Sequence, residues 1–215
     1  VFTGWSDDAS GAGLTSNAIT MNSAKTAKAN WKTQYYLTTS STYGTVVGAG
    51  WYDSGSTAAS FVSSPVSGGA GIQYVVTGYA GTGSAPSGSG MSISFTITAP
   101  SSVAWNWQTQ YYLTINSARD SPTPASGWFS SNTQITASVT SPAEESGGTR
   151  YRCTGWTGTG SVQASGTSTS ATFNILAPSS ITWNWQIQYY LTVNSAYGTH
   201  GGQDWYDSGS SVSVT

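Results

Sequence analysis

The sequence predicts an all-β fold made of small tandem repeats, each about 77 residues long. Apolar and polar residues alternate with a period of two in several segments, as in strands with one buried face. No segment shows the 3.6-residue apolar period of a helix. Aromatic residues make up 13% of the chain and include 10 Trp, so the chain has the large side chains that a folded core needs.

Four sequence landmarks recur in the same order and define the repeat. One is Gln-Tyr-Tyr-Leu-Thr, which begins at Gln34, Gln110 and Gln188. Another is a tryptophan followed by a Gly- and Ser-rich turn, at Trp51, Trp128 and Trp205. The remaining two are Thr-Gly followed by an aromatic residue, at Trp5, Tyr79 and Trp156, and an Asn-Trp pair that ends at Trp31, Trp107 and Trp185. Such regular recurrence is typical of a repeat protein.

The landmarks divide the chain into four parts. They are the C-terminal part of a repeat at 1–33, complete repeats at 34–109 and 110–187, and the N-terminal part of a repeat at 188–215. By the same alignment Val1 corresponds to Val75 and Thr215 to Phe61, both in the middle of a repeat. The sequence favours a segment of a longer covalent array. The alternative is separate subunits that complete one another's half-repeats by strand donation.

The strands can be placed in order along the first complete repeat. Residues 57–62 and 72–78 are rich in Val, Phe and Tyr and are separated by a Ser/Pro/Gly loop. Residues 91–98 and 103–115 both alternate, and the Ala-Pro-Ser-Ser turn between them predicts a hairpin. Residues 23–30 resemble a helix in composition, but the corresponding segments of the later repeats contain proline, so we expect no helix there.

The segment 103–115 crosses a repeat boundary without Gly, Pro or Asp. One face of the predicted strand carries Trp105, Trp107, Thr109, Tyr111, Leu113 and Ile115. The opposite face carries Asn106, Gln108, Gln110 and Thr114. At ~3.3 Å per residue such a strand extends roughly 43 Å, about twice the usual length. A single strand shared by two repeats permits little bending, so the sequence predicts small, Ig-like β-sandwich repeats joined into a rigid rod.

The low charge of the chain excludes several classes of function. Only 7% of residues are charged, against about 25% in an ordinary soluble domain, and the net charge is −2. Nucleic-acid binding is excluded because the chain cannot neutralise a run of phosphates. No apolar run reaches the ~20 residues of a membrane span. With one Cys and one His, we expect no metal site, no cofactor and no disulfide within the chain.

The acidic pairs and the histidine do not predict an enzyme. Asp7-Asp8 and Glu144-Glu145 are adjacent in sequence, whereas two-carboxylate catalysis needs carboxylates placed across a cleft. His200 lies in a Gly-rich segment without the Gly-x-Ser-x-Gly motif of a hydrolase. We therefore expect solvated surface charges, a surface histidine and no catalytic residue.

Two further residues have simple structural interpretations. Asp53 and Asp207 recur in Trp-Tyr-Asp-Ser-Gly, which suggests a calcium loop, but we assign Ser131 to that place in the middle repeat. We therefore expect Asx-type turns, in which the aspartate side chain bonds to nearby backbone. Cys153 aligns with Val76 and is expected to be a small buried apolar residue.

The N-terminal part of the chain carries a family resemblance. Three of its segments, Phe-Thr-Gly-Trp-Ser at 2–6, Asn-Ala-Ile-Thr-Met at 17–21 and Lys-Thr-Ala-Lys-Ala-Asn-Trp at 25–31, precede Tyr-Leu-Thr at 36–38. Together they resemble the divergent InlB B-repeat-like domains of bacterial and archaeal surface proteins. The later copies depart from that pattern. For instance, Tyr79 replaces the tryptophan.

The resemblance implies secreted or surface-anchored multidomain proteins whose repeats carry no catalytic residues. It also implies an alternative fold for each repeat, the β-grasp with a short helix. It supplies no ligand and no site residues.

The recurring tryptophans Trp51, Trp128 and Trp205 are the candidate binding residues. An exposed indole in a polar turn can stack on a sugar ring, and tandem copies would add avidity. Because a small domain needs large side chains for its core, packing in the core or between domains is the favoured interpretation. The sugar-binding hypothesis predicts that the three rings are exposed and coplanar, and it fails if they are packed beneath a turn.

A charge-poor β protein meets little electrostatic resistance to association. The sequence therefore predicts a structural component of an extracellular fibre, sheath or surface layer at the cell surface. Its partners are other copies of itself, joined head to tail or laterally. The alternative is a carbohydrate-binding adhesin, or the stalk of a secreted enzyme, with a polysaccharide as partner. With few titratable groups, stability is expected to vary little with pH.

Overall fold

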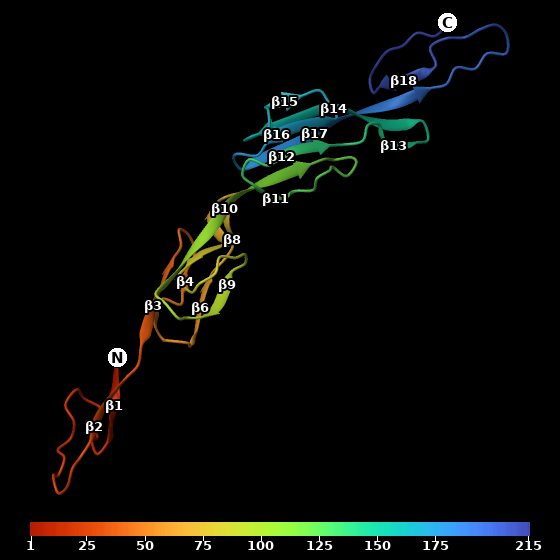
Figure 1. Ribbon diagram of the computed structural model, residues 1–215. Coiled ribbons are helices and arrows are strands. Elements are labelled where there is room, and N and C mark those ends of the chain that lie inside the picture. Colours follow the sequence, from red (N-terminus) through yellow and green to blue (C-terminus); the bar gives the residue numbers. More distant parts are fainter. The chain divides into compact units, whose positions relative to one another are not determined.

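The computed structural model describes all 215 residues and consists of strands, turns and bends without any helix (Figure 1). The prediction of an all-β fold is confirmed, and no helix is present that is long and apolar enough to cross a membrane. The chain divides into two compact units. The first unit is Val1–Val66 with Tyr74–Trp107, and the second unit is Ser67–Gln73 with Gln108–Thr215.

The first unit contains a β-sandwich and an additional pair of strands. Its strands are β1 (Phe2–Asp7), β2 (Ala27–Trp31), β3 (Gln34–Ser40), β4 (Val46–Val47), β5 (Gly50–Asp53), β6 (Thr57–Val62), most of β8 (Ile72–Thr82), β9 (Ser92–Thr96) and the first part of β10 (Ser101–Asn116). β3 pairs with β5 antiparallel and with β10 parallel, and β8 also pairs with β10. β6 lies between β4 and β9 in a second sheet, and β1 pairs with β2 separately.

The second unit also consists of strands in two sheets. Its further strands are β11 (Gly127–Ser130), β12 (Gln134–Ser138), β13 (Ala143–Ser146), β14 (Thr149–Thr159), β15 (Ser165–Gly166), β16 (Ser170–Asn174), β17 (Ser179–Leu191) and β18 (Asp204–Asp207). β7 (Val66–Gly69) and the start of β8 form a hairpin whose tip, 67–73, belongs to this unit. β17 pairs with β14 and β18 antiparallel and with β10 parallel, while β12 and β16 form the second sheet.

Each unit has a core of alternating inward-facing side chains between its two sheets. In the first unit the buried residues are Leu37, Ala58, Val62, Val76, Ala85, Ile93, Ile97, Val103 and Trp105. In the second unit they are Leu113, Ile135, Ala137, Val139, Cys153, Trp156, Val162, Ala171, Ile175, Ile181 and Trp183. The prediction that Cys153 is a small buried apolar residue is confirmed.

The predicted extended segment is confirmed. β10 runs without a break from Ser101 to Asn116, through the whole of 103–115. Trp105 and Leu113 on its inward face are buried, whereas Asn106 on the other face is exposed.

Residues 23–30 form no helix, as expected, since β2 begins within them. β10 and β17 each run through a Gln-Tyr-Tyr landmark as one continuous strand. At the first Gln-Tyr-Tyr landmark, by contrast, β2 and β3 are separate strands with two residues between them.

The predicted hairpin of 91–98 with 103–115 is wrong. β9 pairs with β6, whereas β10 pairs with β3 and β8 in the other sheet. Ile97 and Val103 are both fully buried, since each strand contributes its apolar face to the same core from a different sheet. The Ala-Pro-Ser-Ser segment is therefore a corner between sheets, because a hairpin would place both apolar faces on one sheet.

Serine hydroxyls hold this corner in both units. Ser84 Oγ accepts hydrogen bonds from the backbone N–H groups of Thr98 and Ala99 at 2.9 and 3.0 Å. The buried Ser101 hydroxyl accepts from the Ser84 N–H at 2.9 Å and donates to the Ala99 carbonyl at 2.8 Å. These bonds satisfy backbone groups that belong to neither sheet ladder.

In the second unit we expect Ser161→Ala to lower the free energy of unfolding by about 1–2 kcal/mol. Ser161 Oγ accepts from the N–H groups of Leu176 and Ala177 at 2.8 and 3.1 Å, and the variant leaves both without that acceptor. Urea denaturation measures the change. Ser168→Ala is the control, because Ser168 is exposed and bonds only to Ser170. Equal effects of the two variants would contradict the corner role.

The Thr-Gly-aromatic landmark also has a structural origin. The register of β14 against β17 shifts between Cys153 and Gly155, where Gly155 has a φ of +121°. A Cβ on Gly155 would lie 2.0 Å from the carbonyl oxygen of Gly166. The next residue, Trp156, packs its ring against Gly166, whose own Cβ would lie 2.4 Å from that ring. The landmark therefore marks a β-bulge that only glycine fits.

Candidate functional site

Each Gln-Tyr-Tyr landmark places its second tyrosine opposite one of the recurring tryptophans. In the first two landmarks strand alternation turns the first tyrosine and the leucine toward a core and the second tyrosine away from it. In the third landmark the first tyrosine, Tyr189, is itself exposed. In the register of the paired strands the cross-strand pairs are Tyr36 with Trp51, Tyr112 with Trp128, and Tyr190 with Trp205. Their ring centroids are 5.2 Å apart in all three pairs. We call these the Tyr–Trp pairs.

The recurring tryptophans do not pack in the core. Trp51 is 67% exposed and Trp128 is 39% exposed, while Trp205 is partly buried and lies outside both core clusters. The prediction of core packing is therefore wrong for these positions, and packing between domains stays a prediction. The tryptophans that fill the cores are Trp105, Trp156 and Trp183. Trp156 belongs to the Thr-Gly-aromatic landmark, and Trp105 and Trp183 each lie two residues before the tryptophan of an Asn-Trp pair. The tyrosines of the pairs belong to the Gln-Tyr-Tyr landmark, but they were not predicted from the sequence as binding residues.

Polar side chains flank each Tyr–Trp pair two positions along the same strands. Beside Trp51, the Gln34 amide donates to Asp53 Oδ1 at 2.8 Å, and Lys32 Nζ lies 2.8 Å from the same carboxylate oxygen. Residues two apart in a strand share a face, so this polar group adjoins the aromatic rings. Its one carboxylate and one ammonium balance each other.

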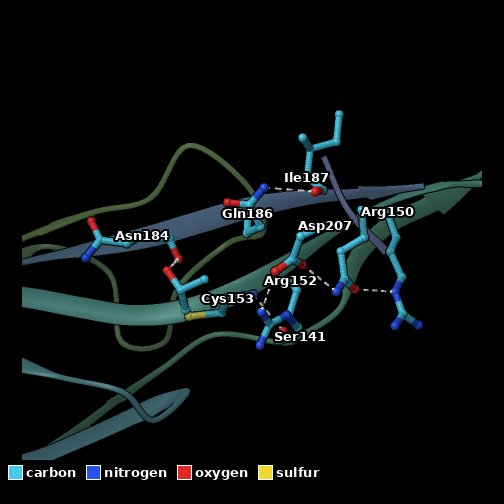
Figure 2. Close-up of polar contacts among 10 residues, drawn as sticks. Ser141, Arg150, Arg152, Cys153, Asn184, Gln186, Ile187 and Asp207 are labelled. Carbon is cyan, nitrogen blue, oxygen red and sulfur yellow. Dashed lines mark hydrogen bonds and ion pairs between the residues drawn. The ribbon is translucent and has the colours of Figure 1, made fainter. Parts of the chain in front are cut away.

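The third pair has a larger polar group. The Gln188 amide donates to Asp207 Oδ1 at 2.8 Å, Arg150 Nε donates to Gln188 Oε1 at 2.9 Å, and Arg152 lies 3.3 Å from Asp207 Oδ2. Figure 2 shows the Arg152 side chain beside Asp207, whereas the Arg150 side chain, two residues earlier on β14, points away from Asp207. The Arg150 guanidinium also lies over the Trp205 ring, 4.4 Å from its centroid. This is cation–π geometry.

The aspartates do not form Asx turns. The carboxylates of Asp53 and Asp207 accept from glutamine, lysine and arginine side chains, and a backbone hydrogen bond closes the same turn in every repeat. In the middle repeat the residue opposite Gln110 is Ser130 rather than Ser131, since Trp128 is followed by one residue and then Ser130. The side chains gather no cluster of three or more metal-ligating His, Cys, Asp or Glu residues.

The acidic pairs take part in separate surface contacts. Asp8 pairs with Lys25 at 3.2 Å and Glu144 with Arg119 at 3.0 Å. His200 is exposed in the loop before β18. The acidic pairs and His200 form no hydrogen bond or ion pair with a residue of a Tyr–Trp pair.

Hydrogen bonds lower the pKa of two carboxyls. Side-chain bonds from Lys32 and Gln34 hold the pKa of Asp53 below its ordinary value of 3.8. Backbone N–H groups of Thr140 and Ser121 do the same for Asp120. A carboxyl whose pKa is lower in the folded than in the unfolded chain stabilises the fold above its ordinary pKa, and this contribution is lost as the pH falls.

We therefore expect the midpoint of thermal unfolding to be nearly constant between pH 7 and about pH 4, and to fall only in stronger acid. Circular dichroism melts across this range measure it. In Asp53→Asn the fall below about pH 4 is expected to be smaller, because the variant no longer loses a stabilising charge. A sharp loss of stability between about pH 4 and 7 would contradict the prediction.

The geometry thus supplies three pairs of aromatic residues, each with a glutamine two positions away on the same strand. It brings no nucleophile, base and acid together. Comparison with protein-family models, with curated proteins and with solved structures finds no match to this chain.

Proposed function

We propose that this chain is a non-catalytic structural segment of an extracellular filament, sheath or surface-layer protein. It assembles with other copies of itself through β-rich, charge-poor faces. The observation that carries the proposal is the character of the smaller sheet in each unit. Both its outward face and its edge strand are free of charge and of proline.

The outward faces carry hydroxyl, amide and apolar groups, including one large aromatic residue, Phe61. On β6 and β9 they are Thr57, Ala59, Phe61, Ser92, Ser94 and Thr96. On β12 and β16 they are Gln134, Thr136, Ser138, Ser170, Thr172 and Asn174. Thr136 and Thr172 face each other across the sheet, with their hydroxyls 3.0 Å apart. Such a face gives an approaching copy hydrogen-bonding groups without charge repulsion.

The edges of these sheets lack the usual protection against strand pairing. β9 is the edge of its sheet, and β16 pairs only with β12. Most proteins guard such edges with charged side chains, especially Lys, or with proline. β13, at the edge of the larger sheet, does carry the charges Glu144 and Glu145. The contrast selects β9 and β16 as the edges that join copies.

The tandem, rod-like arrangement is part of the same proposal. It is supported by equal registers in successive repeats, since Leu37 of β3 pairs with Ser101 of β10, and Leu113 of β10 pairs with Ser179 of β17. The InlB B-repeat-like resemblance supports an extracellular location.

The test compares assembly of the wild-type chain with that of a double variant, Ser94→Lys with Thr172→Lys. Both side chains face outward on the proposed contact strands, so each contact would bring lysines together. Sedimentation velocity over a range of concentrations, with electron microscopy, measures assembly. We expect oligomers or fibres from the wild type, little dependence on salt, and monomers from the double variant.

The matched control is Ser146→Lys, on the β13 edge that already carries charge. It is expected to assemble like the wild type. A wild-type chain that stays monomeric at millimolar concentration would overturn the proposal. So would a double variant that assembles normally.

A further inference from the structure

We propose that the Tyr–Trp pairs bind the rings of a neutral polysaccharide. This inference is separate from assembly, because the pairs lie on the larger sheet of each unit and the proposed contact edges lie on the smaller one. The middle pair, Tyr112 with Trp128, shows the site most fully, since the chain continues for a complete repeat on both sides of it.

The middle pair combines an aromatic surface with uncharged hydrogen-bonding groups. The rings of Tyr112 and Trp128 meet edge to face, with an interplanar angle of 73°. Two positions along the same strands, Gln110 lies opposite Ser130, and the Gln110 side-chain oxygen accepts from the Gln73 amide at 2.8 Å. A sugar ring has the complementary chemistry, because its C–H face suits the negative face of an aromatic ring and its hydroxyls suit amides and serine.

The size of the pair argues against a protein partner. Two aromatic side chains bury about 150–250 Å² each when fully covered, whereas a specific protein interface buries about 1,200 Å² or more. Beside Tyr112 the surface adds only two small apolar residues, Ala70 and Pro178, among Gly71, Thr114, Thr159, Ser179 and Ser180. A patch of this area fits one or two sugar rings.

The differing charges around the pairs identify a neutral ligand. The first pair has a balanced Lys32 and Asp53, and the middle pair has only Gln73, Gln110 and Ser130. The third pair has two arginines and one aspartate. The aromatic rings are what all three share, so recognition through them does not depend on charge. A polymer offers equivalent rings to several pairs at once, which raises the overall affinity.

The three pairs are not expected to bind equally. Arg150 stacks on Trp205, and the same position in the middle repeat is occupied by Gln73, which bonds to Gln110 instead. Arg150 therefore covers part of the ring that a sugar would need. Trp51 and Trp128, the more exposed indoles, should supply most of the binding.

The experiment is affinity electrophoresis of the 215-residue chain in gels that contain a neutral β-glucan, with hydroxyethyl cellulose and mannan as further neutral probes. Polygalacturonate is the charged comparison. We expect retardation by at least one neutral polymer. The double variant Trp51→Ala with Trp128→Ala should bind at least tenfold more weakly, Trp205→Ala should bind like the wild type, and Arg150→Ala should bind more tightly.

Phe61→Ala is the matched control, because Phe61 is an exposed aromatic residue of the smaller sheet. It is expected to leave binding unchanged, and near-ultraviolet circular dichroism checks that each variant is folded. Absence of binding to all the neutral polymers would overturn the inference, as would unchanged binding by the double tryptophan variant. It would also be overturned if that variant lost self-association rather than sugar binding. The lysine variants at β9 and β16 test assembly independently.

Discussion

Replacing Gly155 by alanine is expected to lower the free energy of unfolding of the second unit by about 4 kcal/mol. Gly155 has a φ of +121°, a conformation that costs an L-residue roughly 1–3 kcal/mol. Its new Cβ would also lie 2.0 Å from the Gly166 carbonyl oxygen, and relieving such a contact costs about 1–3 kcal/mol more. Total domain stability is only about 5–15 kcal/mol, so a large part of it would be lost.

Gly69→Ala separates the two causes. Gly69 has a similar φ of +113° in the same unit, but a Cβ there meets no atom within 4 Å. We expect this variant to lose only about 1–2 kcal/mol, the conformational part of the cost. Urea denaturation followed by tryptophan fluorescence measures both. Equal losses in the two variants would show that the approach of Gly155 to Gly166 does not constrain the bulge.

Trp183→Ala is expected to lower the free energy of unfolding by about 3–5 kcal/mol. Trp183 is 2% exposed, lies in the core of the second unit and faces Trp156 across the strand pair. Truncating a buried tryptophan removes its packing and leaves a cavity. The same denaturation experiment measures the loss, and Trp128→Ala, which truncates an exposed indole, should cost less than about 1 kcal/mol.

Trp183→Phe tests the origin of this loss. The Trp183 indole N–H is buried without an acceptor, so no hydrogen bond is lost when it is removed. We expect phenylalanine to retain most of the packing and to cost less than half as much as alanine. If phenylalanine and alanine were equally destabilising, packing would not explain the contribution of this side chain.

Local pattern predicts which residues form strands and which side chains face inward. The alternation at 103–115 identified β10 and placed Trp105 and Leu113 on the same face, which is the buried face in both units. Pattern does not identify the strand that pairs with it. The Ala-Pro-Ser-Ser segment looks the same in sequence whether it joins two strands of one sheet or crosses between sheets. The acceptor that holds the corner, the Ser84 hydroxyl, comes from elsewhere in the chain.

The candidate site was predicted only in part. The recurrence of Trp51, Trp128 and Trp205 marked them as candidates, but recurrence is equally compatible with a core role. Their exposure depends on the tyrosines opposite them, and those tyrosines belong to a neighbouring strand. The available signal was the Tyr-Tyr doublet itself. In a strand, adjacent residues face opposite sides, so one tyrosine of each doublet must point away from the core.

The strand-forming character of the chain, the repeat spacing and the low charge follow from the sequence, because each is a property of composition or of neighbouring residues. Three other features become evident only in the folded chain: β9 and β10 lie in different sheets, Gly155 must be glycine, and the recurring tryptophans lie outside the cores. These features depend on atoms far apart in the chain that approach one another only when two sheets enclose a common core.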